Sequence, residues 1–116
     1  MEIHDLIQTA HATAVDKGWW EENDPERNIG SLLALVHSEV SEALEDYRNS
    51  SENPRLFPDW YYDDTGKPVG FASELADIII RIADLCGGYR IDLDTALHAK
   101  LNYNKKRPVR HGNKRA

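Results

Sequence analysis

Apolar residues recur at three- and four-residue intervals along four segments of the chain, which is the spacing of one face of an α-helix. Strand signals are weak throughout. The pattern predicts four helices, over residues 3–17, 29–48, 71–86 and 92–107. Residues that commonly end or begin helices flank these segments: Gly18, Gly87-Gly88 and Pro108 as stops, and Asp92 as an N-cap.

Four amphipathic helices in so short a chain indicate an all-α fold, because each apolar stripe must be buried against another helix. We therefore predict a four-helix bundle that forms one domain over residues 1–116 and ends in a basic C-terminal tail. A bundle of this size leaves apolar surface uncovered, which favours a homodimer or homotetramer. The long connection over residues 50–69 is of the kind found as lids, binding loops or disordered segments.

Composition excludes several classes of protein. No apolar run is long enough to cross a membrane, and the acidic start of the chain lacks the apolar core of a signal peptide, so we expect a cytoplasmic protein. Cys86 is the only cysteine, which excludes intramolecular disulfides and thiolate-rich zinc sites. The net charge of -6 divides unevenly: residues 1–99 carry 7 basic and 20 acidic side chains, and residues 100–116 carry 7 basic and no acidic ones.

Two pairs of carboxylates lie at helical spacing beside apolar residues: Glu39 with Glu42, and Glu74 with Asp77. Packing the two helices together would bring all four near one point. At a separation of about 6 Å each like-charge contact is unfavourable by roughly 3 kcal/mol, so the group calls for a cation. All-oxygen ligands favour Mg²⁺ or Mn²⁺. The alternative is that both acidic pairs lie on a solvated helix face.

A di-iron bundle is a rival metal site, but it requires a Glu-x-x-His motif. None of the five histidines has Glu or Asp three residues before it.

Basic and amide side chains are aligned on the last predicted helix. Lys100, Asn104 and Arg107 follow an i, i+4, i+7 spacing that places them on one face. Lysine and arginine there would compensate the roughly four negative charges of a nucleoside triphosphate. The alternative is a solvated tail, or one that pairs with the acidic body. Nucleic-acid binding is disfavoured, because the rest of the chain would repel a polyanion.

Three segments of the chain resemble the MazG-like, all-α nucleoside triphosphate pyrophosphohydrolases. The likeness covers roughly residues 11–114 and preserves the family's order of motifs. The segments are His37-Ser38-Glu39-Val40-Ser41-Glu42-Ala43, Gly66-Lys67-Pro68-Val69-Gly70-Phe71-Ala72-Ser73-Glu74-Leu75-Ala76-Asp77-Ile78, and Lys100-x-x-x-Asn104-x-x-Arg107-Pro108-x-Arg110-His111-Gly112.

The resemblance implies a role for each group of residues. The metal ligands would be Glu39, Glu42, Glu74 and Asp77, and the phosphate-binding residues Lys100, Asn104 and Arg107. The base-binding residues would be His11 and Trp20, with Trp19 an equal contender. Packing in a core or a dimer interface is the alternative for these three side chains.

The activity implied by the resemblance is Mg²⁺-dependent hydrolysis of (d)NTPs between the α and β phosphorus atoms. The products would be a nucleoside monophosphate and pyrophosphate, as in nucleotide-pool housecleaning, with Glu39 or Glu42 as the group that orients or deprotonates water. One alternative is a non-catalytic helical module that binds a partner or nucleic acid through its basic C-terminal tail. Another is a member of the same family restricted to one deoxynucleotide.

Overall fold

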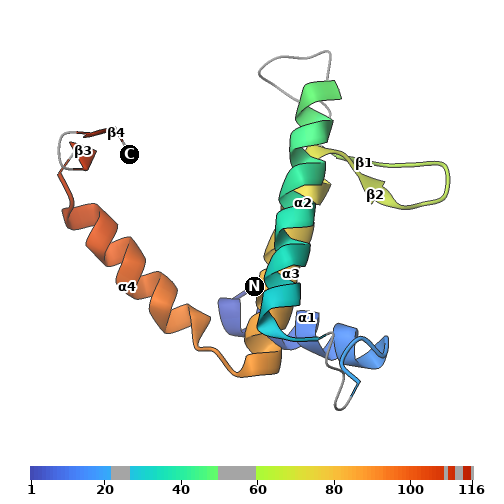
Figure 1. Cartoon of the computed structure of the whole chain (residues 1–116), viewed down its shortest axis with the longest axis horizontal. Helices are drawn as coiled ribbons and strands as arrows, with labels where there is room; N and C mark the ends of the chain where they lie inside the picture. Colours follow the sequence, from blue (N-terminus) through green and yellow to red (C-terminus); the bar gives the residue numbers. More distant parts are fainter. Residues whose placement is uncertain (22–26, 50–59, 109, 112–113, 116) are drawn as a thin grey trace.

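The computed structural model describes residues 1–21, 27–49, 60–108, 110–111 and 114–115, and these are mostly helical (Figure 1). The all-α prediction is therefore confirmed. The helices are α1 (Ile3–Asp16), α2 (Ile29–Asn49), α3 (Phe71–Tyr89) and α4 (Leu93–Lys106). The structure also contains two short antiparallel strand pairs that the sequence did not indicate. Strand β1 (Tyr61–Tyr62) pairs with β2 (Pro68–Val69), and β3 (Arg110–His111) pairs with β4 (Lys114–Arg115).

Helix α3 is the centre of the packed part of the molecule, because α1 and α2 both pack against it (Figure 1). The core between them is thin and consists mainly of small side chains. Its buried apolar residues are Ala10, Ala14, Leu32, Ala43, Ala83, Leu85 and Cys86. Such a core permits close approach of the helices but buries little apolar area.

Helix α4 extends away from the α2–α3 pair and contributes no buried residue (Figure 1). The radius of gyration is 17.0 Å, against about 13 Å for a compact domain of this length. The predicted arrangement of all four helices in one bundle therefore stays a prediction. Among the described residues, no helix combines the length and the apolar character needed to cross a membrane.

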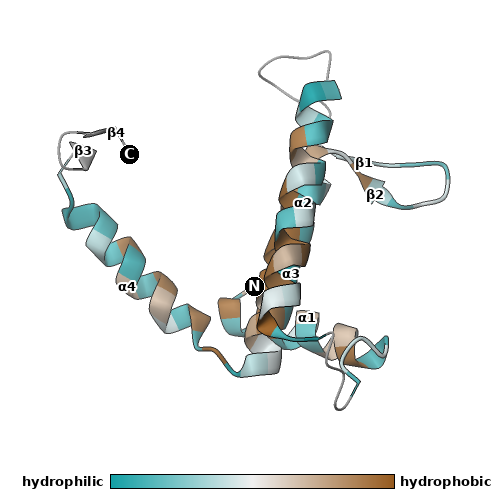
Figure 2. Ribbon diagram, viewed as in Figure 1, coloured by the Kyte–Doolittle hydropathy of each residue, from teal (hydrophilic) through white to brown (hydrophobic). Residues whose placement is uncertain are grey.

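Much of the apolar surface of α2 and α3 is not covered within the chain. Figure 2 shows apolar positions along the length of α3. One stripe on each helix has side chains that are 36–53% exposed: Leu33, Val40, Leu44 and Tyr47 on α2, and Leu75, Ile79 and Ile82 on α3. The apolar pattern of α2 is thus divided, with Leu32 and Ala43 buried and this second stripe left open.

The predicted end of the third helix at Gly87-Gly88 is wrong. Helix α3 continues through both glycines to Tyr89, and Arg90 ends it in the left-handed conformation with φ of 55°. The glycines are needed for close packing instead. A Cβ on Gly87 would lie 2.5 Å from Cβ of His11, and one on Gly88 would overlap the ring of Trp20.

Local side-chain hydrogen bonds cap the starts of α2 and α4. The expected Asp92 cap is confirmed, because its carboxylate accepts a hydrogen bond from the backbone N–H of Thr95 at 3.1 Å. Asn28 has the same role before α2, where its side chain accepts from the N–H of Ser31 at 2.8 Å.

The connection predicted over residues 50–69 ends in a small hairpin formed by β1 and β2. Its turn is held by Asp63, whose carboxylate accepts from the backbone N–H groups of Thr65 and Lys67 at 2.8 and 3.0 Å. Residues 50–59 of this connection lie outside the described residues.

Candidate metal centre

Three carboxylates from two helices converge where α2 packs against α3. Glu39 on α2 and Glu74 and Asp77 on α3 each place one oxygen within 4.8 Å of the other two. Glu74 and Asp77 share a face of α3 because they are three residues apart, and α2 brings Glu39 to that face. At this distance each pair of ionised carboxylates repels by about 3.5 kcal/mol. The predicted convergence is thus found for three of the four acidic residues.

The fourth carboxylate, Glu42, lies beside this triad with an exposed side chain. Hydrogen bonding to its carboxyl group is among the influences that lower the pKa of Glu39, and its charge helps to raise the pKa of Glu74. Glu42 is therefore near both residues while remaining open to water. This combination distinguishes it from Glu39, which is only 8% exposed.

Burial and mutual repulsion make two of the triad carboxyls hard to ionise. The pKa of Glu74 is raised to about 7, first by burial and then by the charges of Glu42, Asp46, Asp77 and Glu39. Burial and the charge of Glu39 also raise the pKa of Asp77, against the opposing influence of Arg81 and Lys67. A carboxyl that is half-protonated near neutrality becomes fully ionised when a cation is supplied.

Arg81 is the cation that this centre already contains. Its Nε donates to Oε1 of Glu39 at 2.7 Å across the α2–α3 interface. Burial alone would raise the pKa of Glu39, but hydrogen bonds, chiefly from Arg81, hold it below its usual value. Arg81 was detectable in the sequence as a charged residue directly after Ile78-Ile79-Ile80, one helical turn after Asp77.

The residues present fit a divalent cation. Oε2 of Glu74 is buried and has no hydrogen-bond partner among the described residues. An orphaned carboxylate oxygen inside a set of close carboxylates is unfavourable unless a donor or a cation satisfies it. The donor set contains only oxygen, as Mg²⁺ and Mn²⁺ prefer.

The three predicted phosphate-binding residues lie together but away from the triad, Lys100 and Asn104 on α4 and Arg107 directly after its end, in extended conformation. Lys100 and Arg107 both lie over the ring of Tyr103, at 6.0 and 5.4 Å, and Nη1 of Arg107 donates weakly to Asn104 at 3.4 Å. Since α4 extends away from α2 and α3 (Figure 1), a single chain does not bring these residues to the carboxylates.

Two of the three predicted base-binding residues are held by a carboxylate that the sequence analysis missed. Nε1 of Trp20 donates to Oδ1 of Asp84 at 2.7 Å, and Nδ1 of His11 lies 3.0 Å from the same oxygen. Their rings meet edge to face at 5.1 Å. These contacts favour the packing alternative for His11 and Trp20, whereas Trp19 is 54% exposed.

The same junction includes two further residues that sequence reasoning missed. Nη2 of Arg27 donates to Oδ2 of Asp84 at 2.9 Å, and the guanidinium lies 4.9 Å from the centre of the Trp20 ring. The hydroxyl of Tyr89 donates to the backbone carbonyl of Arg27 at 3.1 Å. Asp84 was detectable in the sequence as an acidic residue among the apolar residues Ile82, Ala83, Leu85 and Cys86.

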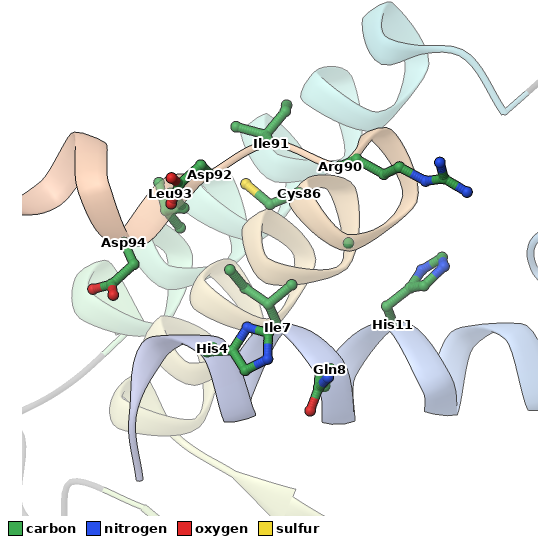
Figure 3. Close-up of a pocket in the computed structure, with 11 residues that line it drawn as sticks. His4, Ile7, Gln8, His11, Cys86, Arg90, Ile91, Asp92, Leu93 and Asp94 are labelled. Atoms are coloured by element: carbon green, nitrogen blue, oxygen red, sulfur yellow. The ribbon is translucent and has the colours of Figure 1, made fainter.

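A cavity of about 490 Å³ lies between α1, the end of α3 and the start of α4. Figure 3 shows His11 and Arg90 toward one end of it and Asp94 at the other. It contains none of the triad carboxylates. The cavity and the acidic centre are therefore separate features.

No family model, curated protein or solved structure matches this chain. Its function is therefore inferred from its residues and their geometry.

Proposed function

We propose that the chain is a MazG-like nucleoside triphosphate pyrophosphohydrolase that depends on Mg²⁺. It would cleave (d)NTPs between the α and β phosphorus atoms, in cytoplasmic nucleotide-pool housecleaning. The observation that carries the proposal is the convergence of Glu39, Glu74 and Asp77 around the orphaned oxygen of Glu74. These are the residues onto which the metal ligands of the resembled family fall.

In this proposal Glu39, Glu74 and Asp77 hold the cation, with Glu42 as a further ligand or neighbour. Mg²⁺ is favoured, and Mn²⁺ suits the same ligands. The bound ion would polarise phosphoryl oxygens and offset the charge that develops on them.

Glu42 is the better candidate for the group that takes a proton from the attacking water. Arg81 engages one oxygen of Glu39, and burial limits the access of water to this side chain. Glu42 is exposed and adjacent, so its carboxylate can receive the proton as the water oxygen attacks the α phosphorus and pyrophosphate departs.

We further propose that the active form is a homodimer or homotetramer. The open apolar stripes of α2 and α3 would pack against those of a second copy. Opposite charges on the acidic body and on α4 favour a contact between copies that brings Lys100, Asn104 and Arg107 of one chain to the carboxylates of the other. This arrangement accounts for an α4 that buries nothing within its own chain.

The test is incubation with a panel of ribo- and deoxynucleoside triphosphates and Mg²⁺, with separate assays for pyrophosphate and phosphate. We expect pyrophosphate and a monophosphate, and no turnover in EDTA. Asp77→Asn should abolish turnover with normal helical circular dichroism. Its matched control, Glu45→Gln, changes an exposed carboxylate that pairs with Arg48 on the surface of α2, and should remain active. Release of phosphate instead of pyrophosphate, or full activity of Asp77→Asn, would contradict the proposal.

A further inference from the structure

Arg81 lies at the acidic centre and has hydrogen-bonding capacity to spare. Its Nε is occupied by Glu39, and its side chain is 36% exposed. Neither Nη1 nor Nη2 makes a hydrogen bond to another residue in the described part of the chain. A guanidinium carries five N–H donors in a planar fork, so four of them remain for a ligand.

A ligand of these donors would be an anion, because the guanidinium of Arg81 is positively charged and has only hydrogen-bond donors. Glu39, Glu42, Glu74 and Asp77 would repel a polyphosphate, and one divalent cation offsets only part of their charge. Lys100 and Arg107 lie far from the triad within a single chain. Among the described lysines and arginines, Arg81 is the one that forms an ion pair with a triad carboxylate. A guanidinium also matches the spacing of two phosphate oxygens better than an ammonium does.

We propose that Arg81 is a substrate-binding residue whose Nη1 and Nη2 hold a phosphate group of the nucleotide while its Nε remains hydrogen-bonded to Glu39. This inference rests on the proposed function and adds to it a phosphate ligand on α3, within the same chain as the carboxylates. The substrate class it recognises is a magnesium-complexed polyphosphate.

The same geometry makes Arg81 a competitor of the metal ion. Both interact with Glu39, and two cations close together repel each other. Removing the positive charge of Arg81 should therefore strengthen binding of the metal alone and weaken binding of the phosphate ligand. A purely structural role would give a different result, because loss of the clamp on Glu39 would weaken both.

The experiment measures two affinities by titration calorimetry, for Mn²⁺ alone and for pyrophosphate in excess Mg²⁺. The proteins are the wild type, Arg81→Gln, Arg81→Lys and the control Arg48→Gln, which changes an exposed arginine at the end of α2. For Arg81→Gln we expect unchanged or tighter Mn²⁺ binding and about 10- to 100-fold weaker pyrophosphate binding, as for loss of a charged hydrogen bond. Arg81→Lys should show a smaller loss, and Arg48→Gln none.

Each other outcome has a definite meaning. Pyrophosphate binding as tight in both Arg81 variants as in the wild type would overturn the inference and leave the proposed function intact. A parallel loss of Mn²⁺ and pyrophosphate binding in Arg81→Lys, a variant that retains the charge, would also overturn it in favour of a structural clamp. A wild-type protein that binds neither ligand would refute the proposed function, and the role of Arg81 with it.

Discussion

Replacing Glu74 with glutamine should stabilise the metal-free protein above neutral pH and have almost no effect on its stability near pH 4. Burial and four neighbouring carboxylates raise the pKa of Glu74 from 4.5 to about 7. The native state therefore retains this proton where the unfolded chain has released it. The resulting stabilisation is complete below pH 4.5 and is lost as the pH rises through about 7. Glutamine has a similar shape and is neutral at every pH.

The size of the effect follows from the same shift. A rise from 4.5 to about 7 sets an upper limit of about 3.4 kcal/mol, at roughly 1.4 kcal/mol for each pH unit. Glu74 is only half-buried, and water screens part of the repulsion, so we expect about 1–2 kcal/mol. This gain should appear in the free energy of unfolding of Glu74→Gln relative to the wild type at about pH 8.5.

The assay is urea unfolding in EDTA at about pH 4 and pH 8.5, followed by circular dichroism and tryptophan fluorescence. Comparing variant with wild type at each pH subtracts the contribution of Glu39, whose lowered pKa stabilises the native state above about pH 4.5 and loses this effect as the pH falls. Adding Mg²⁺ at the higher pH should stabilise the wild type and not Glu74→Gln. Glu45→Gln should behave as the wild type throughout. Equal destabilisation of Glu74→Gln at both pH values, or equal stabilisation of both proteins by Mg²⁺, would refute the reasoning.

Three further predictions concern the division of roles, the packing of α3 and assembly. Glu42→Gln should lower kcat at least about 100-fold while retaining Mn²⁺ binding, whereas Glu39→Gln should lose both turnover and Mn²⁺ binding. Titration calorimetry for Mn²⁺ and steady-state assays of turnover distinguish the two variants. Gly88→Ala should destabilise the protein by about 1–3 kcal/mol despite the better helix propensity of alanine, because its Cβ would overlap the ring of Trp20. In a double-mutant cycle measured by urea unfolding, Trp20→Ala in the same chain should remove most of this effect. Ile79→Lys should shift the protein toward monomer in analytical ultracentrifugation; an unchanged distribution would exclude the exposed stripe of α3 as an interface.

The helices were predictable from the sequence because their periodicity is strong, and the boundaries were less so. The end of α3 shows why. A Gly-Gly pair commonly stops a helix, but here both glycines are required by His11 and Trp20, which approach from a segment more than sixty residues away in the chain. Local helix propensity depends on neighbouring residues alone and therefore does not predict such a contact.

The sequence predicted both the helix faces that carry the carboxylates and their convergence, but not which carboxylates would join the centre. Spacing placed Glu74 with Asp77, but only the packing of α2 on α3 shows that Glu39 joins them and that Glu42 remains exposed. Arg81 and Asp84 were missed for one reason: each is a charged residue in an apolar stretch, and a search for recurring apolar positions passes over such exceptions. The structure shows that Arg81 pairs with Glu39 across the α2–α3 interface and that Asp84 pairs with Arg27 in the segment before α2.

The exposed stripes and the charge distribution both support the proposed assembly of two or more copies. The chain buries mainly small side chains between its helices and leaves seven larger ones partly exposed on α2 and α3, so apolar area remains available for burial. Helix α4 carries basic side chains and contributes no buried residue, so these charges are available to pair with acidic groups. A second copy would supply apolar surface for the stripes and acidic groups for α4. Folding α4 back onto its own chain would cover the stripes of that one copy and leave fewer routes by which a substrate could reach the proposed metal centre. In the proposed enzyme, Ile79→Lys should therefore lower pyrophosphohydrolase activity together with assembly, although Ile79 is not a ligand of metal or phosphate.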